Sequence, residues 1–196
     1  MVPSGPPHQD PILRTKLHRP PVTEELVLRE RLHQQMDRGL ETPLTLVSAP
    51  AGYGKSVLVS QWAEALEQPC AWLSLDAEDS DLTVFLSYVL AAIRTRFPAA
   101  CPRTEALIVA PHPTPMRFLG RCLINELDAI DTPFVLVLDD YHGIAPTSDV
   151  HELLDMLLEH PPRPLHLVIA TRRDPPLNIR ERFVRDGGAS CSPPAV

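Results

Sequence analysis

The stretch that decides the fold is Ser48-Ala-Pro-Ala-Gly-Tyr-Gly-Lys-Ser56. It follows the apolar run Leu44–Val47, which is typical of a buried strand, and it leads into an amphipathic pattern over residues 57–66, which predicts a helix. A strand, a glycine-containing turn and a helix in this order form the context of a phosphate-binding loop. The glycines let the backbone aim several N–H groups at one anion, and the helix N-terminus adds the positive end of its dipole.

Two side chains in this loop have a predicted chemical role. We expect Lys55 to reach the terminal phosphates of a nucleotide and the Ser56 hydroxyl to be a magnesium ligand. Lysine is rare in the chain, which has only Lys16 and Lys55, so its presence in the loop strengthens the signal. The loop departs from the consensus at Ala49, where glycine is expected, and alanine tolerates far less positive φ. The alternative interpretation is an ordinary glycine-rich turn.

The run Phe134–Leu138, followed directly by Asp139-Asp140, has the form of a Walker B element. A buried strand in a parallel sheet delivers such carboxylates to the edge where the phosphate-binding loop lies. Asp139 there is predicted to hold magnesium between the β- and γ-phosphates. Asp140 is predicted to orient or deprotonate an attacking water. The alternative is that two aspartates simply end a strand and begin a turn.

Arg172 follows another strand-like run, Leu165–Ala170, in the same way. An arginine at this place can contact a γ-phosphate and so distinguish ATP from ADP, because only ATP supplies the additional charge. A surface arginine after a strand is the competing interpretation.

Strands and helices alternate along the chain. A further strand is predicted at residues 70–75, and helices are predicted at about 29–38, 82–96, 116–130 and 150–159. Apolar strands that alternate with helices indicate an α/β fold with a parallel sheet covered on both faces. Prolines between positions 98 and 115 predict a loop region around the short apolar segment Ala106–Val109.

Length and composition limit the organisation. With 196 residues we expect one medium domain. We expect a proline-rich extended arm (1–22) before this P-loop domain (23–180) and a disordered tail (181–196) after it. The net charge of −7 argues against a nucleic-acid-binding surface as the main feature. No apolar run approaches the roughly 20 residues needed to cross a membrane, and the four cysteines form no C-x-x-C pair. We therefore expect a reduced, cytoplasmic protein.

Together these motifs resemble the N-terminal nucleotide-binding domain of MalT-like, LuxR-type large ATP-binding regulators, a branch of the STAND class of signalling NTPases related to AAA and NB-ARC domains. The segments that carry the resemblance are residues 14–20, 27–32, 48–56, 61–62, 72–76, 137–142 and 170–172. The resemblance implies a P-loop NTPase fold of the ASCE type that binds ADP at rest and ATP when active, with magnesium, and that self-associates in the ATP form.

The resemblance also assigns residues. Val27 and Arg29 would lie near the adenine end, and Asp139 with Ser56 would hold magnesium. Asp140 would support slow hydrolysis, and Arg172 would sense the γ-phosphate. The phosphates would be held by Ala49, Pro50, Ala51, Gly52, Tyr53, Gly54, Lys55 and Ser56.

The chain also departs from the family. Members run to several hundred residues, with a further sheet strand, a winged-helix region, sensor repeats and a DNA-binding helix-turn-helix. We interpret the chain as truncated and expect its sheet to lack the last core strand, so DNA binding and inducer sensing are not carried over. One alternative is a remnant that acts only as a protein-interaction module, through self-association or association with full-length relatives. An independent small kinase or hydrolase is disfavoured, because no arginine-rich lid or acceptor signature is present.

Overall fold

The computed structural model describes residues 11–22, 29–178 and 190–191. Its centre is a parallel sheet with the strand order β2-β3-β4-β1-β5. The strands are β1 (Leu44–Ser48), β2 (Cys70–Ser74), β3 (Phe134–Asp139), β4 (Leu165–Thr171) and β5 (Ser190–Cys191). β3 and β4 are buried along their whole length, which is why Phe134–Leu138 is apolar throughout and β4 is apolar up to Ala170 apart from His166.

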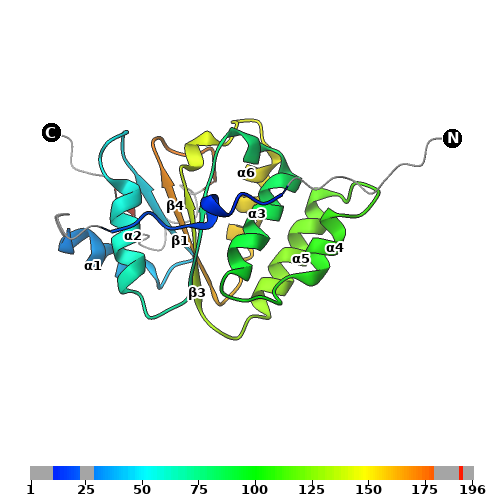
Figure 1. Ribbon diagram of the computed structural model, residues 1–196, viewed down its shortest axis with the longest axis horizontal. Helices are drawn as coiled ribbons and strands as arrows, with labels where there is room; N and C mark the ends of the chain where they lie inside the picture. Colours follow the sequence, from blue (N-terminus) through cyan, green and yellow to red (C-terminus); the bar gives the residue numbers. More distant parts are fainter. Residues whose placement is uncertain (1–10, 23–28, 179–189, 192–196) are drawn as a thin grey trace.

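Helices cover both faces of the sheet, as predicted for an α/β fold (Figure 1). The α-helices are α1 (Glu30–Gly39), α2 (Lys55–Ala65), α3 (Leu82–Arg94), α4 (Pro102–Ile108), α5 (Met116–Asp128) and α6 (Asp149–Glu159). Three 3-10 turns are η1 (Arg14–Leu17), η2 (Ala77–Ser80) and η3 (Tyr141–Gly143). None of the helices in the described ranges has the length and hydrophobicity needed to span a bilayer.

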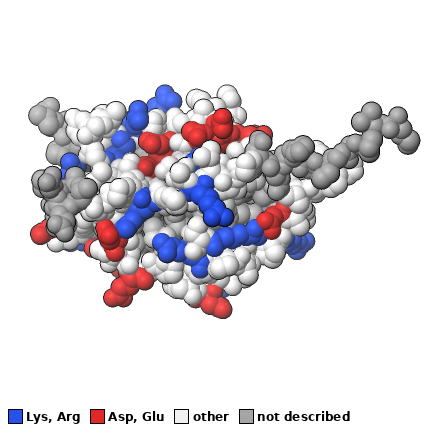
Figure 2. Space-filling model, viewed as in Figure 1, with Lys and Arg blue, Asp and Glu red and all other residues white. Residues whose placement is uncertain are grey.

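Two hydrophobic clusters fill the two sides of the sheet. Along β3, Val135 and Val137 belong to the cluster on the α1–α2 side, whereas Leu136 and Leu138 belong to the cluster beneath α3, α5 and α6. This alternation follows from the two-residue period of a strand. On the face shown in Figure 2, acidic and basic side chains are intermixed, so the negative net charge is not gathered into one patch there.

The strand order brings the predicted motifs to one edge. β4 lies between β1 and β3, with Ser48 opposite Thr171 and Leu138 opposite Ile169 in the register. The carboxyl ends of parallel strands lie at the same end of the sheet. The phosphate-binding loop after β1, Asp139 at the end of β3 and Arg172 after β4 are therefore neighbours there.

Two expectations about local structure were wrong. The segment around Ala106–Val109 was predicted as a loop, but Pro102–Ile108 forms α4. Pro102 occupies the first turn, where its missing N–H costs nothing, and the Glu126 carboxylate of α5 accepts hydrogen bonds from the Arg103 and Thr104 N–H groups. The arm was predicted to be extended throughout, but Arg14–Leu17 forms η1, since no proline falls inside those four residues.

The segment 181–196, predicted to be a disordered tail, contributes β5. Ser190 and Cys191 pair in parallel with Leu46 and Val47, on the edge of the sheet that was expected to lack its last strand. The pairing covers two positions, against five between β1 and β4. An open strand edge offers unpaired N–H and C=O groups that any extended segment can use. Because this pairing does not require apolar side chains, the small polar residues of the segment did not predict a strand. The other residues of this segment lie outside the described ranges.

Candidate nucleotide-binding site

The phosphate-binding loop has the backbone that its glycines predict. Gly52 and Gly54 have φ values of 82° and 72°, in the left-handed region that glycine adopts without strain. Gly54 is the N-cap of α2, so the N–H groups of that helix begin directly at the loop. Ala49 replaces the first consensus glycine, and its N–H donates to the Thr171 carbonyl at 3.2 Å. This hydrogen bond to β4 continues the sheet pairing into the start of the loop.

Lys55 is largely buried beneath the loop and donates from Nζ to the Pro50 carbonyl at 3.0 Å. Burial lowers the pKa of Lys55, and the positive charge of Arg172 lowers it further. The carboxylates of Asp140 and Asp139 act in the opposite direction and raise the pKa. The loop tip, residues 50–53, is exposed.

Ser56 and Asp139 come from the two predicted nucleotide motifs and are in direct contact. Ser56 Oγ donates to Asp139 Oδ1 at 2.9 Å, and the Asp140 N–H donates to the same oxygen at 2.9 Å. Asp139 is 3% exposed, and burial raises the pKa of its carboxyl. A hydroxyl and a carboxylate oxygen are hard ligands of the kind that Mg²⁺ binds. The donor set therefore fits this ion.

Asp140 lies beside Asp139 in an unusual conformation. Its φ is 54°, and it is one of two non-glycine residues with positive φ in the described part of the chain. Aspartate tolerates this left-handed region better than most residues, and here it lies between β3 and η3 as the N-cap of η3. The side chain remains 44% exposed, so the carboxylate is open to the solvent side of the site.

His142 joins the site although its position in the sequence did not mark it as a site residue. Its Nδ1 lies 3.7 Å from Asp140 Oδ1 and is buried without a hydrogen-bond partner. Burial lowers the pKa of His142, and the positive charge of Arg172 lowers it further. The sequence places His142 two residues after Asp140, but it does not predict the left-handed turn that brings the two side chains together.

Arg29 lies over the phosphate-binding loop. Its Nη1 donates to the Tyr53 carbonyl at 3.1 Å, and its Nη2 lies 3.9 Å from the position that a Cβ on Gly54 would take. Arg29 is also the N-cap of α1, so it joins this helix to the loop. Val27, the other residue assigned to the adenine end, lies outside the described residues. Arg172 follows β4 directly and is exposed.

The combination of a phosphate-binding loop, a buried strand ending in Asp139 and a parallel sheet defines a P-loop ATPase domain. Residues 24–170 match the family described as the AAA ATPase domain, and the chain belongs to this family.

The chain is similar to two curated relatives, both named HTH-type transcriptional regulator MalT. It is 37% identical to the protein of Yersinia enterocolitica and 39% identical to that of Serratia proteamaculans, in each case over 176 residues. The match covers 89% of the chain but 19% of each relative. The chain thus spans about a fifth of the length of these regulators and corresponds to their N-terminal region.

Solved structures share the fold. The Cdc6p protein of Pyrobaculum aerophilum superposes with a TM-score of 0.61 at 17% identity, covering 91% of this chain and 48% of that one. A Walker-type ATPase of Pyrococcus abyssi superposes with a TM-score of 0.53 at 16% identity, covering 76% of this chain and 46% of that one. At these identities the likeness shows the fold alone.

Proposed function

We propose that this chain is the ATP/ADP-binding switch domain of a MalT-like, LuxR-family transcriptional regulator and that it hydrolyses ATP slowly with Mg²⁺. The observation that carries the proposal is the 2.9 Å contact between Ser56 and Asp139, which brings the two predicted nucleotide motifs together beside Lys55. The similarity to the N-terminal region of MalT regulators supports the regulatory part, and with it a cytoplasmic location.

Each side chain has a distinct task in this proposal. The loop N–H groups and the N-terminus of α2 bind the phosphates, and Lys55 exchanges its hydrogen bond with the Pro50 carbonyl for a phosphate oxygen. Ser56 and Asp139 hold Mg²⁺, which neutralises charge on the β- and γ-phosphates when bound.

The remaining residues act on the reacting end and on the nucleoside. Asp140, which is exposed beside Asp139, orients or deprotonates the attacking water. Arg172 contacts the γ-phosphate and so distinguishes ATP from ADP. Arg29 faces the nucleoside while its contact with Tyr53 joins α1 to the loop. The resemblance assigns the same role to Val27, which lies outside the described residues.

The first experiment is equilibrium binding of fluorescent ADP and ATP, with Mg²⁺, to the wild type and to Lys55→Ala. Loss of a charge-assisted hydrogen bond should weaken ATP binding by about tenfold or more. Arg163→Ala is the matched control, because it also replaces a basic side chain by alanine, but at the exposed ion pair between Arg163 and Asp128. A folded wild type that binds neither nucleotide would contradict the proposal.

The second candidate function is a protein-interaction module without nucleotide turnover. The observation that favours it is the edge of β1, where Leu46 and Val47 are the positions that pair with β5 among the described residues, because a strand edge can also pair with another chain. Such a module would self-associate, or associate with full-length relatives, equally well in wild type and Lys55→Ala. Sedimentation of both proteins with and without ATP distinguishes the two candidates.

A further inference from the structure

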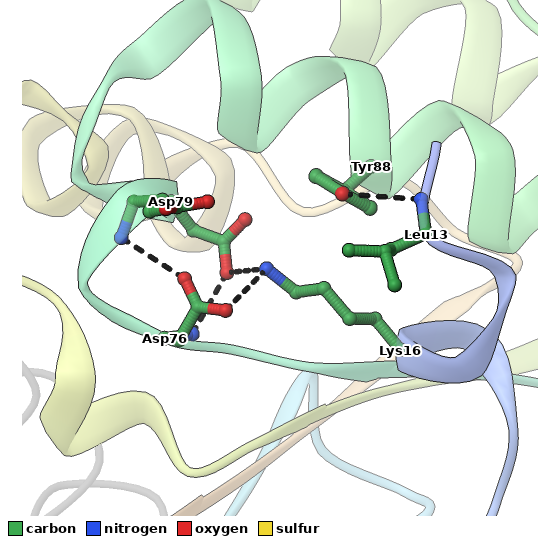
Figure 3. Close-up of polar contacts among 6 residues, drawn as sticks. Leu13, Lys16, Asp76, Asp79 and Tyr88 are labelled. Carbon is green, nitrogen blue, oxygen red and sulfur yellow. Dashed lines mark hydrogen bonds and ion pairs between the residues drawn. The ribbon is translucent and has the colours of Figure 1, made fainter. Parts of the chain in front are cut away.

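The second lysine of the chain fixes the N-terminal arm to the end of β2 (Figure 3). Lys16 Nζ lies 2.5 Å from Asp79 Oδ2 and 3.0 Å from Asp76 Oδ2, and it sits 4.3 Å from the centre of the Tyr88 ring. The Leu13 N–H donates to the Tyr88 hydroxyl at 3.2 Å. Four contacts thus hold one short turn of the arm, and they leave the Lys16 side chain only 12% exposed.

Asp79 depends on this lysine. Its side chain has no exposed surface, and its Oδ2 accepts hydrogen bonds from both Lys16 and the Asp76 N–H. Its Oδ1 is buried without a hydrogen-bond partner. Lys16 is the cation that pairs with Asp79 in the described part of the chain, and removal of one partner from a buried ion pair is strongly destabilising. Lys16 therefore stabilises η2, which carries Asp79, together with the capping box between Asp76 and Asp79.

The turn η2 in turn supports the loop that follows Asp140. A Cβ added to Gly143 would lie 3.2 Å from the backbone of Asp76, so the two turns are in close contact. Ser80 Oγ accepts from the Ala145 N–H at 2.9 Å, and Ser148 Oγ donates to the Ser80 carbonyl at 2.6 Å. The segment 143–148 rests on η2 at three points, and it begins three residues after Asp140.

We propose that Lys16 is a positioning residue for hydrolysis: by neutralising Asp79 it fixes η2, and η2 fixes the loop that holds Asp140 and His142. Docking of the N-terminal arm then sets the rate of hydrolysis without contact to the nucleotide. The inference rests on the proposed ATPase function, and it adds a means of regulation, because any partner that draws the arm away from η2 slows hydrolysis and prolongs the ATP state.

The first test measures the mechanical link in the absence of nucleotide. Hydrogen–deuterium exchange is compared between wild type, Lys16→Met and Arg163→Met over peptides that cover residues 140–148. Lys16→Met should speed exchange there several-fold while peptides from β4 stay unchanged, and Arg163→Met should behave as wild type. Equal exchange of the 140–148 peptides in wild type and Lys16→Met would overturn the inference.

The second test separates binding from hydrolysis. We expect Lys16→Met to slow single-turnover hydrolysis of Mg·ATP by about tenfold, since small displacements of a reacting group carry costs of this order, with less than about a threefold change in ATP affinity. Lys16→Arg should restore most of the rate, because it keeps the charge. Lys16→Met/Asp79→Asn should also recover part of it, because no unpaired charge stays buried.

The outcomes are distinct. If Lys16→Met fails to fold, the double variant and Lys16→Arg still carry the test. The inference is then overturned if both of these variants fold but neither hydrolyses ATP. An unchanged rate in Lys16→Met also overturns it and leaves the proposed function intact. A wild type that binds no nucleotide overturns the proposed function, while the exchange measurement, made without nucleotide, still reports the link.

Discussion

At the scale of single residues, Asp139 determines how the site depends on pH. Burial raises the pKa of its carboxyl above the ordinary value of 3.8. The folded chain therefore holds this proton more tightly than the unfolded chain. The contribution of Asp139 to stability is complete below pH 3.8 and is lost as the pH rises through the raised pKa. At neutral pH the ionised, buried carboxylate of Asp139 therefore lowers the stability of the fold.

Asp139→Asn should therefore stabilise the protein without nucleotide. The asparagine Oδ1 can accept the same two hydrogen bonds, from Ser56 Oγ and the Asp140 N–H, while the buried charge is removed. We expect the free energy of unfolding to rise by about 1 kcal/mol at pH 7, and the gain to shrink towards pH 4. Urea unfolding at both pH values measures it, with the exposed Asp131→Asn as control. A loss of stability at pH 7 would contradict this interpretation.

Asp140→Asn tests the neighbouring carboxylate. Because Asp140 is exposed and its side chain is not needed to hold Asp139, the variant should keep ATP bound with an affinity close to that of wild type. Loss of a general base costs about 10²- to 10⁴-fold in rate, so single-turnover hydrolysis should fall by at least the lower figure. A wild-type rate in this variant would exclude the proposed role.

The sequence predicted some of these residues and not others. Lys55, Ser56 and Asp139 were predicted because their chemistry is tied to fixed positions around a strand end, and the structure brings them together. His142 was missed because its approach to Asp140 depends on a left-handed turn that aspartate adopts only in context. The contact of Arg29 with Tyr53 joins segments 24 residues apart, and no local pattern encodes such a contact.

At the scale of secondary-structure elements, the close approach of η3 to η2 depends on Gly143. A Cβ at this position would lie 3.2 Å from the Asp76 Cα and carbonyl carbon, and these backbone atoms cannot turn aside. Gly143→Ala should push the two turns apart by a few tenths of an ångström. We expect hydrolysis to fall several-fold while nucleotide affinity changes little, as measured in parallel single-turnover and binding assays.

Gly120→Ala in α5 is the matched control for this prediction. The added Cβ there would meet the far end of the flexible Met156 side chain, which can rotate away, and alanine favours the helix over glycine by about 1 kcal/mol. Both variants add one methyl group at a tight helix or turn contact. If Gly120→Ala slowed hydrolysis as much as Gly143→Ala, the effect would not come from the η2–η3 contact.

The elements differ in how far the sequence predicts them. β3 and β4 were predicted to within a residue because strands buried on both faces consist mainly of apolar residues. The helix α4 was missed because its N-terminus is capped by Glu126, which lies in another helix. The arm was predicted as extended from its prolines, yet η1 is held by Lys16, whose partners lie 60 and 63 residues away.

At the scale of the whole molecule, the site gathers segments from the central part of the sheet. The loop after β1, the end of β3 and the residue after β4 all face the same edge, and Arg29 brings in α1. A ligand bound there would contact residues that follow three strands of one sheet. Its binding free energy must therefore be added to the free energy of global unfolding.

Thermal unfolding with increasing Mg·ADP or Mg·ATP tests this coupling. At a ligand concentration about 100 times Kd, stability should increase by about 2.7 kcal/mol. For a domain of this size that corresponds to a rise in Tm of about 5 to 10 °C. Lys55→Ala should reduce the rise by about half or more, because a Kd that is tenfold weaker leaves the ligand at only about 10 times Kd. Removal of Mg²⁺ with EDTA should reduce the rise in wild type but not in Asp139→Asn, whose metal ligand is already absent. If EDTA had the same effect on both proteins, Mg²⁺ would bind elsewhere than at Ser56 and Asp139, and the contact between the two motifs would not be the metal site.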